Sequence, residues 1–377
     1  MAGTNLLSLG DLACGSPQSL ECLGGHGARS ARNDDFRHGR RVGHYLRPGP
    51  LSRNLFCQGG ACMSVALEPT MAHVPQETTV AAGSPSIARD LAMLTRPRIA
   101  VMVLATVATG MWLTGGGFPS SVWLSVLIGT GLVAASSSIA NQIVEQRLDR
   151  QMPRTADRPL ASGRLHTSSA LWLTAISLVV GTGLLISASF WAAVAAVFTW
   201  LVYVVAYTPL KRITPLNTAV GAVSGAMPVV IGWLAADGPQ RVVAGELEGT
   251  LAAAALTTVL YLWQFPHFMA IAWLYRQQYA RAGMQMLTVA DPSGLRAGGQ
   301  ALAAALAMVP VSLLLAVPSG SPRLFLAEAF AAGIYVAATA HFAIRRDDTA
   351  ARRLLMASLG TLAAVMIAVV TFGRPSL

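Results

Sequence analysis

The stretch from residue 141 to residue 160 holds the densest group of charged side chains in a largely apolar part of the chain. Asn141, Glu145 and Asp149 follow one another at four-residue intervals, so on an α-helix they share one face over about two turns. Three oxygen-bearing side chains on one face suit a hard cation such as Mg²⁺, in a setting where the ion also binds phosphate. Guanidinium groups match phosphate oxygens, and the stretch contains Arg147, Arg150, Arg154 and Arg158. The pattern predicts an Mg²⁺–diphosphate site at the end of a membrane helix.

A simpler alternative for this stretch is a basic loop whose acids only pair with its arginines, since acid–base pairs four residues apart are common on helices. Against it, Asn141 and Glu145 lie at or near hydrocarbon depth, where ionisable groups are costly and usually functional. Pro153 and Pro159 also end the helix. They place the arginines that follow on a loop that can fold back over the site.

The composition indicates a multi-pass helical membrane protein. The chain has 377 residues, of which 54% are hydrophobic and 12% are charged, well below the roughly 25% charged residues of a soluble domain. Apolar runs long enough to cross a bilayer recur from about residue 98 onward. The fold class that we predict is all-α, a bundle of nine transmembrane helices. The expected spans are roughly 98–115, 120–141, 168–188, 190–208, 217–235, 250–273, 299–317, 324–343 and 353–373.

The loops predict the orientation. One set of loops and the lead-in before the first span hold seventeen of the lysines and arginines after residue 85, and the other set holds three. By the positive-inside rule the first set, with the N-terminal side, is cytoplasmic. The net charge of +10 then favours contact with anionic lipid headgroups of the bilayer rather than with nucleic acid. We expect a bacterial cell inner membrane, with the mitochondrial inner membrane as the alternative.

Residues 1–85 differ from the rest of the chain. They are rich in Gly, Ser, Pro and Arg without apolar periodicity, and we predict a disordered extension. A transit peptide or a mis-assigned start, with Met63 or Met71 as the true one, are alternatives. All four cysteines fall in this region and show no paired CxxC spacing, so the membrane region has no disulfide and no thiolate nucleophile.

Two further stretches carry chemistry. Tyr207-Thr-Pro-Leu-Lys211-Arg212 is a short basic turn after the fourth span. It is either a membrane-side anchor or a second contact with a diphosphate.

The sixth span ends with His267 and, further on, Tyr279. A proline and a histidine inside a span favour a broken helix that lines a cavity. His267 is either a satisfied interior polar group or a contact with a porphyrin edge or propionate. The fifth span carries a face of small residues, which suits helix packing or a slot for a flat ligand: Gly221, Ser224, Gly225, Ala226 and Pro228.

Together these stretches resemble the UbiA superfamily of intramembrane prenyltransferases, over about residues 86–373. The first stretch, continuing through Met152-Pro-Arg154-Thr155-x-x-Arg158-Pro159-Leu160, is similar to the first acidic motif of that superfamily. The later stretches, with Trp263-Gln-x-Pro-His267-Phe268, resemble its heme-directed branch, the protoheme IX farnesyltransferase (heme O synthase) family. The resemblance implies a UbiA-like membrane domain over residues 86–377, after the extension.

The resemblance also implies the reaction. A farnesyl group passes from farnesyl diphosphate to a vinyl group of heme B, giving heme O and diphosphate, on the route to the hemes of terminal oxidases. Mg²⁺ is the implied cofactor, and heme A synthase or oxidase assembly factors are the implied further partners. Metal ligands would be Asn141, Glu145 and Asp149. With Lys211 these would be catalytic, and the substrates would be bound by Arg154, Arg158, Arg212, Tyr207, His267 and Tyr279.

This chain departs from the family in one place. Gln277 and Gln278 occupy the positions, just before Tyr279, where the family carries acidic residues that help to bind a further Mg²⁺. Glutamine is a weaker ligand for a hard cation, so either one Mg²⁺ suffices, or Asp291 or a water substitutes. Two alternatives for the function stay open: a prenyltransferase acting on a quinone precursor, and a transporter or assembly protein with a degenerate site.

Overall fold

Only helices and turns occur in residues 86–115 and 117–373, the part of the chain that the computed structural model describes, and the predicted all-α class is confirmed. The predictions for residues 1–85 lie outside the described residues. The long helices are α2 (Pro97–Leu113), α3 (Ser120–Asp149), α4 (Thr167–Ala188), α5 (Phe190–Leu201), α7 (Asn217–Ala235), α9 (Glu248–Leu274), α12 (Leu295–Leu314), α13 (Pro322–Arg345) and α14 (Asp348–Phe372). The short ones are α1 (Ile87–Thr95), the π-helix η1 (Val202–Tyr207), α6 (Thr208–Leu210), α8 (Gly238–Val243), α10 (Arg276–Arg281) and α11 (Leu287–Ala290).

Each predicted span corresponds to a long helix. Among the described residues, 7 helical stretches are long and apolar enough to cross a membrane, and α1 with α2, bent by 46°, makes an eighth. The remaining predicted span, 250–273, corresponds to α9, which has 27 residues. Its mean apolarity is lowered by polar residues such as Gln264 and His267. The chain is therefore a multi-pass membrane protein, and the count of nine spans stays a prediction compatible with this helix set.

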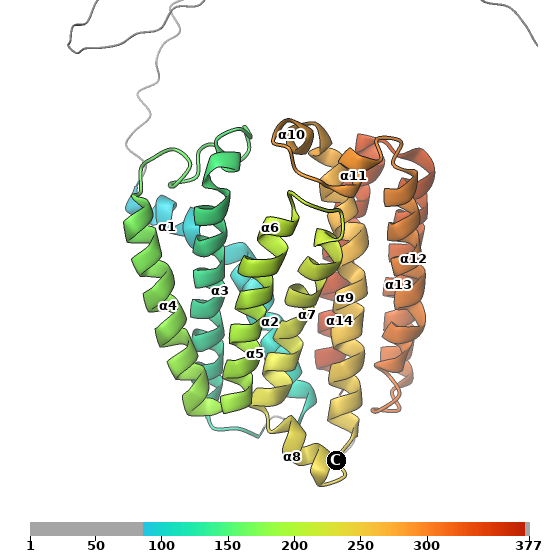
Figure 1. Cartoon of the computed structure of the whole chain (residues 1–377). Helices are drawn as coiled ribbons and strands as arrows, with labels where there is room; N and C mark the ends of the chain where they lie inside the picture. Colours follow the sequence, from blue (N-terminus) through green and yellow to red (C-terminus); the bar gives the residue numbers. More distant parts are fainter. Residues whose placement is uncertain (1–85, 116, 374–377) are drawn as a thin grey trace, which may run out of the picture. The chain divides into compact units, whose positions relative to one another are not determined.

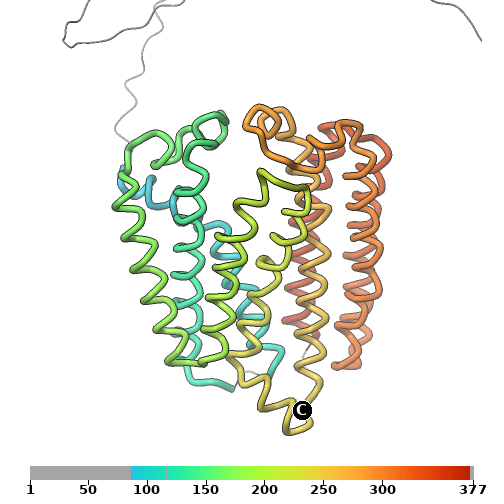
Figure 2. Tube along the Cα trace, in the orientation of Figure 1, coloured from blue at the N-terminus to red at the C-terminus, as the bar shows by residue number. Residues whose placement is uncertain are grey.

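The long helices run side by side, and their connections gather at two ends (Figures 1 and 2). The loop between α3 and α4, the turn between α6 and α7, and the short helices α10 and α11 lie at one end, while α8 lies at the other. The basic stretches of the sequence thus share one end of the bundle, as the loop-charge pattern predicts.

Glycines let two helix pairs approach closely. A Cβ added to Gly110 of α2 would collide with the Val229 carbonyl of α7, and one added to Gly232 of α7 would collide with the Val107 carbonyl of α2. In α3, a Cβ on Gly129 would lie 2.8 Å from a carbonyl oxygen of α4. Small residues at helix contacts are the usual means of bringing backbones together in membranes. These contacts fix α3 and α7, which carry much of the site.

Three local features shape the end of the bundle that holds the basic loops. Helix α3 continues past residue 141, where the predicted membrane span ends, to Asp149, so the predicted polar face is helical. Helix α5 widens into the π-helix η1 before Pro209, a local geometry often found at functional sites. Helices α1 and α2 are separated by Arg96, whose φ is 51°.

Candidate active site

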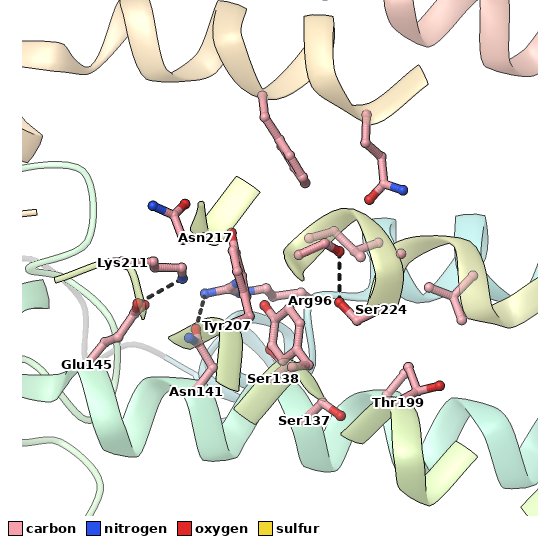
Figure 3. Close-up of a pocket in the computed structure, with 18 of the residues that line it drawn as sticks. Arg96, Ser137, Ser138, Asn141, Glu145, Thr199, Tyr207, Lys211, Asn217 and Ser224 are labelled. Carbon is pink, nitrogen blue, oxygen red and sulfur yellow. Dashed lines mark hydrogen bonds and ion pairs between the residues drawn. The ribbon is translucent and has the colours of Figure 1, made fainter. Parts of the chain in front are cut away.

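A cavity of about 410 Å³ lies inside the bundle, between α2, α3, η1, α7 and α9. Its lining joins stretches that are more than one hundred residues apart in the chain. Figure 3 shows part of this lining. Eight of the predicted site residues contribute to it: Asn141, Glu145, Asp149, Arg154, Arg158, Tyr207, Lys211 and Tyr279.

The predicted polar face of α3 points into this cavity. Asn141, Glu145 and Asp149 are only 1%, 5% and 1% exposed, so three oxygen-bearing side chains are buried on one helix face. The amide of Asn141 donates to the Thr208 hydroxyl at 3.1 Å. Its carbonyl oxygen faces the guanidinium of Arg96 at 3.5 Å. The four-residue spacing therefore produces the shared face that the sequence predicts.

Each acid on this face has a cationic partner from another part of the chain. The ammonium of Lys211 donates to Glu145 Oε1 at 2.8 Å, and Arg158 donates to Asp149 Oδ2 at 2.7 Å. These are the pairs expected where positive groups gather for an anionic ligand. Asp149 Oδ1 is buried and has no hydrogen-bond partner, so one carboxylate oxygen is available to a further cation.

Burial lowers the pKa of both cations, but the net shifts differ in direction. Burial lowers the pKa of Lys211, but the neighbouring Tyr207 and Glu145 outweigh it, and the net pKa of Lys211 is raised. Its ammonium also lies 4.4 Å from the centre of the Tyr207 ring. Burial lowers the pKa of Arg158, and the nearby charge of Arg96 adds to this effect. A guanidinium stays protonated even so, and both residues present positive charge to the cavity.

The oxygen-bearing side chains of α3 could hold Mg²⁺ if waters and substrate phosphates supplied the remaining ligands. Among the described residues, no group of three or more His, Cys, Asp or Glu side chains is placed to hold a metal ion. The α3 face offers two carboxylates and one amide, with Asp149 Oδ1 unpartnered. Mg²⁺ is commonly bound by one or two carboxylates, with waters and substrate phosphates supplying the rest. The residues present fit an ion of that kind.

The loop after α3 folds back toward α9, as its prolines predict. Arg154 lies with its guanidinium 4.6 Å from the centre of the Tyr275 ring and reaches the Tyr279 hydroxyl at 3.5 Å. Arg158 is held by Asp149 on the same loop side of the cavity. The first and third sequence stretches therefore meet at the end of the cavity that holds the charges.

Small residues of α7 make room for polar and aromatic side chains. A Cβ on Gly221 would lie 2.7 Å from the Tyr207 ring, and a Cβ on Gly225 would collide with the Gln264 side chain. Both glycines line the cavity together with Ser224 and Pro228. The small face predicted from the sequence thus opens space inside the bundle as well as packing against neighbours.

Two predicted site residues lie elsewhere. Arg212 is exposed and is absent from the cavity lining. His267 is absent from the lining as well, and its Nδ1 lies 2.8 Å from the Ser358 hydroxyl. Asp291, suggested as a substitute metal ligand, accepts hydrogen bonds from Ser293 and from the Arg296 backbone. These bonds lower the pKa of Asp291, the Ser293 side chain contributing most.

The glutamines that replace the acidic pair also lie outside the lining. Gln277 is exposed. Gln278 is half-buried, and its Oε1 is buried without a hydrogen-bond partner. The adjacent Tyr279 does line the cavity, so position 278 stands beside the site.

Arg96 is the cavity residue that sequence reasoning missed. It occupies the left-handed backbone region between α1 and α2, and its guanidinium reaches the carbonyl oxygen of Asn141. A residue with a β carbon rarely adopts this conformation, and such strain clusters at functional sites. The available signal was an arginine directly before Pro97, which breaks the lead-in helix and turns the side chain toward α3.

Comparison with known proteins shows the family of the chain. Residues 103–364 match the model of the UbiA prenyltransferase family. A protoheme IX farnesyltransferase of Rhodopirellula baltica is 40% identical over 284 residues, covering 73% of this chain and 96% of the relative. The one from Solibacter usitatus is 39% identical over 286 residues, covering 72% and 94%. The human mitochondrial protein of that name is 33% identical over 288 residues, covering 76% and 62%.

Solved structures share the fold. A structure of digeranylgeranylglyceryl phosphate synthase has a TM-score of 0.63 at 15% identity, with 76% of this chain and 98% of that chain covered. A UbiA homologue from Archaeoglobus fulgidus bound to GPP and Mg²⁺ has a TM-score of 0.51 at 15% identity, covering 74% and 99%. The chain belongs to the UbiA prenyltransferase family of membrane enzymes and, within it, to the protoheme IX farnesyltransferases.

Proposed function

We propose that this enzyme transfers the farnesyl group of farnesyl diphosphate to a vinyl group of heme B. The C1–O bond of the diphosphate breaks and a bond forms from C1 to the terminal vinyl carbon. A hydroxide from water adds to the other vinyl carbon, its proton is released, and the products are heme O and diphosphate. The observation that carries the proposal is the cavity in which two buried acids pair with Lys211 and Arg158, in a chain about 40% identical to named protoheme IX farnesyltransferases.

The cations around the cavity form the diphosphate site in this proposal. Arg96, Arg154, Arg158 and Lys211 line the same cavity, and their donors can move from their present protein acceptors to phosphate oxygens. Because these charges are already placed where negative charge develops on the leaving diphosphate, they stabilise the transition state with little reorganisation. Tyr207 and Tyr279 line the same end of the cavity and offer hydroxyl groups to the substrate.

Asn141, Glu145 and Asp149 are the side chains that would hold Mg²⁺. Such an ion acts as a Lewis acid on diphosphate oxygens. When the diphosphate draws Lys211 and Arg158 away, the oxygens of Glu145 and Asp149 become free. The support is the unpartnered Asp149 Oδ1 and the structure of an Archaeoglobus fulgidus homologue bound to GPP and Mg²⁺.

The rest of the cavity suits the farnesyl tail. Its lining away from the charged end is mostly apolar, with a few hydroxyl side chains, and comes from several helices, including residues Val133, Ala196, Pro228 and Ile231. A volume of about 410 Å³ falls in the range of pockets that bury a small-molecule ligand. An allylic cation formed in such a site is shielded from premature capture by water.

The orientation in the membrane follows from charge. We infer that the end holding the 150–166 loop and α10 is cytoplasmic, or matrix-facing in a mitochondrion, because that end carries the excess of arginine. The N-terminus lies on the same side, and a bacterial inner membrane is the preferred location. Heme A synthase and oxidase assembly factors would receive the product.

Heme analysis tests the function. The full chain is expressed in a strain that lacks its own heme O synthase, and extracted hemes are examined by mass spectrometry. We expect the hydroxyethylfarnesyl heme in cells with wild type and its loss with Asp149→Asn. A prenylated quinone precursor in place of heme O would favour the quinone alternative. Failure to release diphosphate from farnesyl diphosphate at any Mg²⁺ concentration would favour the degenerate-site alternative.

A further inference from the structure

His267 is held between two helices by contacts that use only one of its ring nitrogens. Nδ1 lies 2.8 Å from the hydroxyl oxygen of Ser358 on α14. The Trp263 ring stacks on the imidazole, with centroids 4.9 Å apart and planes inclined by 22°. Trp263 is itself fixed, because its indole N–H donates to the Ser358 carbonyl at 2.7 Å. The plane of the imidazole is therefore set by α9 and α14 together.

The Ser358 hydroxyl favours a proton on Nδ1 of His267. Its oxygen also lies 2.7 Å from the Leu355 carbonyl, and when its single hydrogen is donated there it accepts from the imidazole. In this arrangement Nδ1 is the N–H donor. A charged imidazolium is costly inside an apolar helix bundle, so the ring is neutral and Nε2 keeps its lone pair. Such an Nε2 can bind a metal or accept a hydrogen bond, but it cannot donate to a carboxylate such as a porphyrin propionate.

The free nitrogen is open to a ligand. Among the described residues, Nε2 of His267 has no hydrogen-bond partner, and this atom is not fully buried. The side chain as a whole keeps part of its surface exposed. His267 lies one helical turn from Gln264 and from Ile271, both of which line the cavity. A ligand bound at Nε2 would therefore lie within about one helical turn of residues that line the proposed farnesyl site.

This arrangement is that of a metal-binding histidine. Such a residue usually donates its second ring N–H to a fixed acceptor, which sets the tautomer and the ring orientation, and imidazole is a common ligand of heme iron. We propose that Nε2 of His267 is an axial ligand to the iron of the heme substrate, and that Ser358 is the positioning residue behind it. The assignment rests on the proposed function, since heme B is the acceptor there.

Spectroscopy of bound heme tests the ligand directly. Purified full-length protein in nanodiscs is titrated with heme B, reduced, and converted to the ferrous nitrosyl form, whose electron paramagnetic resonance spectrum shows splitting from an axial nitrogen. Growth with ¹⁵N-histidine should change that splitting in wild type. We expect His267→Ala to lose it and added imidazole to restore it. His341→Ala, another histidine within a membrane helix, should keep it.

The positioning role has its own test. Ser358→Ala retains the backbone carbonyl that holds Trp263 and removes only the acceptor of Nδ1–H. We expect it to keep the axial-nitrogen signal while heme affinity falls about 10-fold.

Wild type that forms heme O without a ¹⁵N-sensitive axial signal would overturn the ligand assignment while leaving the proposed function intact. Wild type that makes no heme O and binds no heme would overturn the proposed function and this inference with it. If His267→Ala does not fold, wild-type labelling and Ser358→Ala still decide the question.

Discussion

The ammonium of Lys211 lies 2.8 Å from Glu145 Oε1, and both side chains are buried in the wall of one cavity. The two residues are 66 positions apart in the chain, one on α3 and the other directly after α6. A buried pair of this kind contributes little net stability over an apolar pair, but removing one partner is strongly destabilising. Because the pair lies beside the proposed diphosphate site, we infer that Glu145 keeps the ammonium of Lys211 in position for the substrate.

Lys211→Met should therefore affect both stability and turnover. We expect kcat to fall about 10²–10³-fold, because a fixed cation that stabilises developing charge is lost. The free energy of unfolding should fall by about 3–5 kcal/mol, because Glu145 is left buried without its partner. Diphosphate release and thermal unfolding in detergent measure the two effects.

The double variant Lys211→Met/Glu145→Gln separates these effects. It removes both charges, so most of the lost stability should return while turnover stays low. Recovery of turnover along with stability would contradict a direct role for Lys211 in the reaction.

Asp149→Asn should remove metal-dependent activity without unfolding the protein. The substitution keeps the shape of the side chain but leaves a neutral group, which is a weaker Mg²⁺ ligand than a carboxylate. Turnover should be lost at all Mg²⁺ concentrations, while circular dichroism and heme binding stay as in wild type. Asp157→Asn is the matched control, since Asp157 belongs to the same loop region but lies outside the cavity lining and pairs with Arg89 and Arg164. Normal activity of a folded Asp149→Asn variant would exclude a metal role for this residue.

Much of the fold and the centre of the site were predictable from sequence, for a physical reason. Apolar runs of bilayer length predict membrane helices. The four-residue spacing of Asn141, Glu145 and Asp149 places them on one face of any α-helix, independent of its neighbours. The partners were not predictable in the same way. Lys211 could be suspected, but its pairing with Glu145 depends on how α3 and η1 pack, which local sequence does not encode.

The predicted residues that lie outside the cavity lining, and the one that the sequence did not reveal, have equally local causes. Sequence spacing places His267 on α9 but does not say which face of that helix meets the cavity. In the structure His267 lies outside the cavity lining, and its Nδ1 contacts Ser358 of α14. Arg96 enters the site only because its backbone adopts φ 51°, a conformation that composition and periodicity do not reveal. Arg212 is basic and adjacent to Lys211, yet it follows the turn outward and stays exposed.

Gln278→Asp should lower the Mg²⁺ concentration that gives half-maximal activity. The Gln278 oxygen is buried without a partner next to the cavity-lining Tyr279, so a carboxylate there adds a stronger ligand for a hard cation close to the diphosphate. A severalfold shift is expected in a Mg²⁺ titration of diphosphate release. Gln277→Asp, at an exposed position, should leave the titration unchanged. Equal behaviour of both variants would show that one metal-binding region, on α3, is sufficient.

Gly225→Ala should test the space that α7 leaves for Gln264. A Cβ at this position would collide with the Gln264 side chain, which donates to the Ala222 and Leu260 carbonyls at 3.0 Å each. Overpacking of this kind costs about 1–3 kcal/mol, and displacement of Gln264 into the cavity should raise KM for farnesyl diphosphate. Gly183→Ala in α4 is the control, since nothing lies within 4 Å of its added Cβ. A Gly225→Ala variant as stable and active as this control would contradict the packing argument.

Arg96→Gly should separate backbone strain from side-chain function. Arg96 and Arg346 both occupy the left-handed region, with φ of 51° and 49°, where glycine removes a cost of about 1–3 kcal/mol. Both Arg96→Gly and Arg346→Gly should therefore be at least as resistant to thermal unfolding as wild type. Only Arg96 lines the cavity and faces Asn141, so only Arg96→Gly should reduce kcat/KM for farnesyl diphosphate, by about 10-fold or more for a lost charge-assisted contact. If both variants keep wild-type kinetics, the strain at Arg96 serves only the turn between α1 and α2, and the diphosphate depends on the remaining cations.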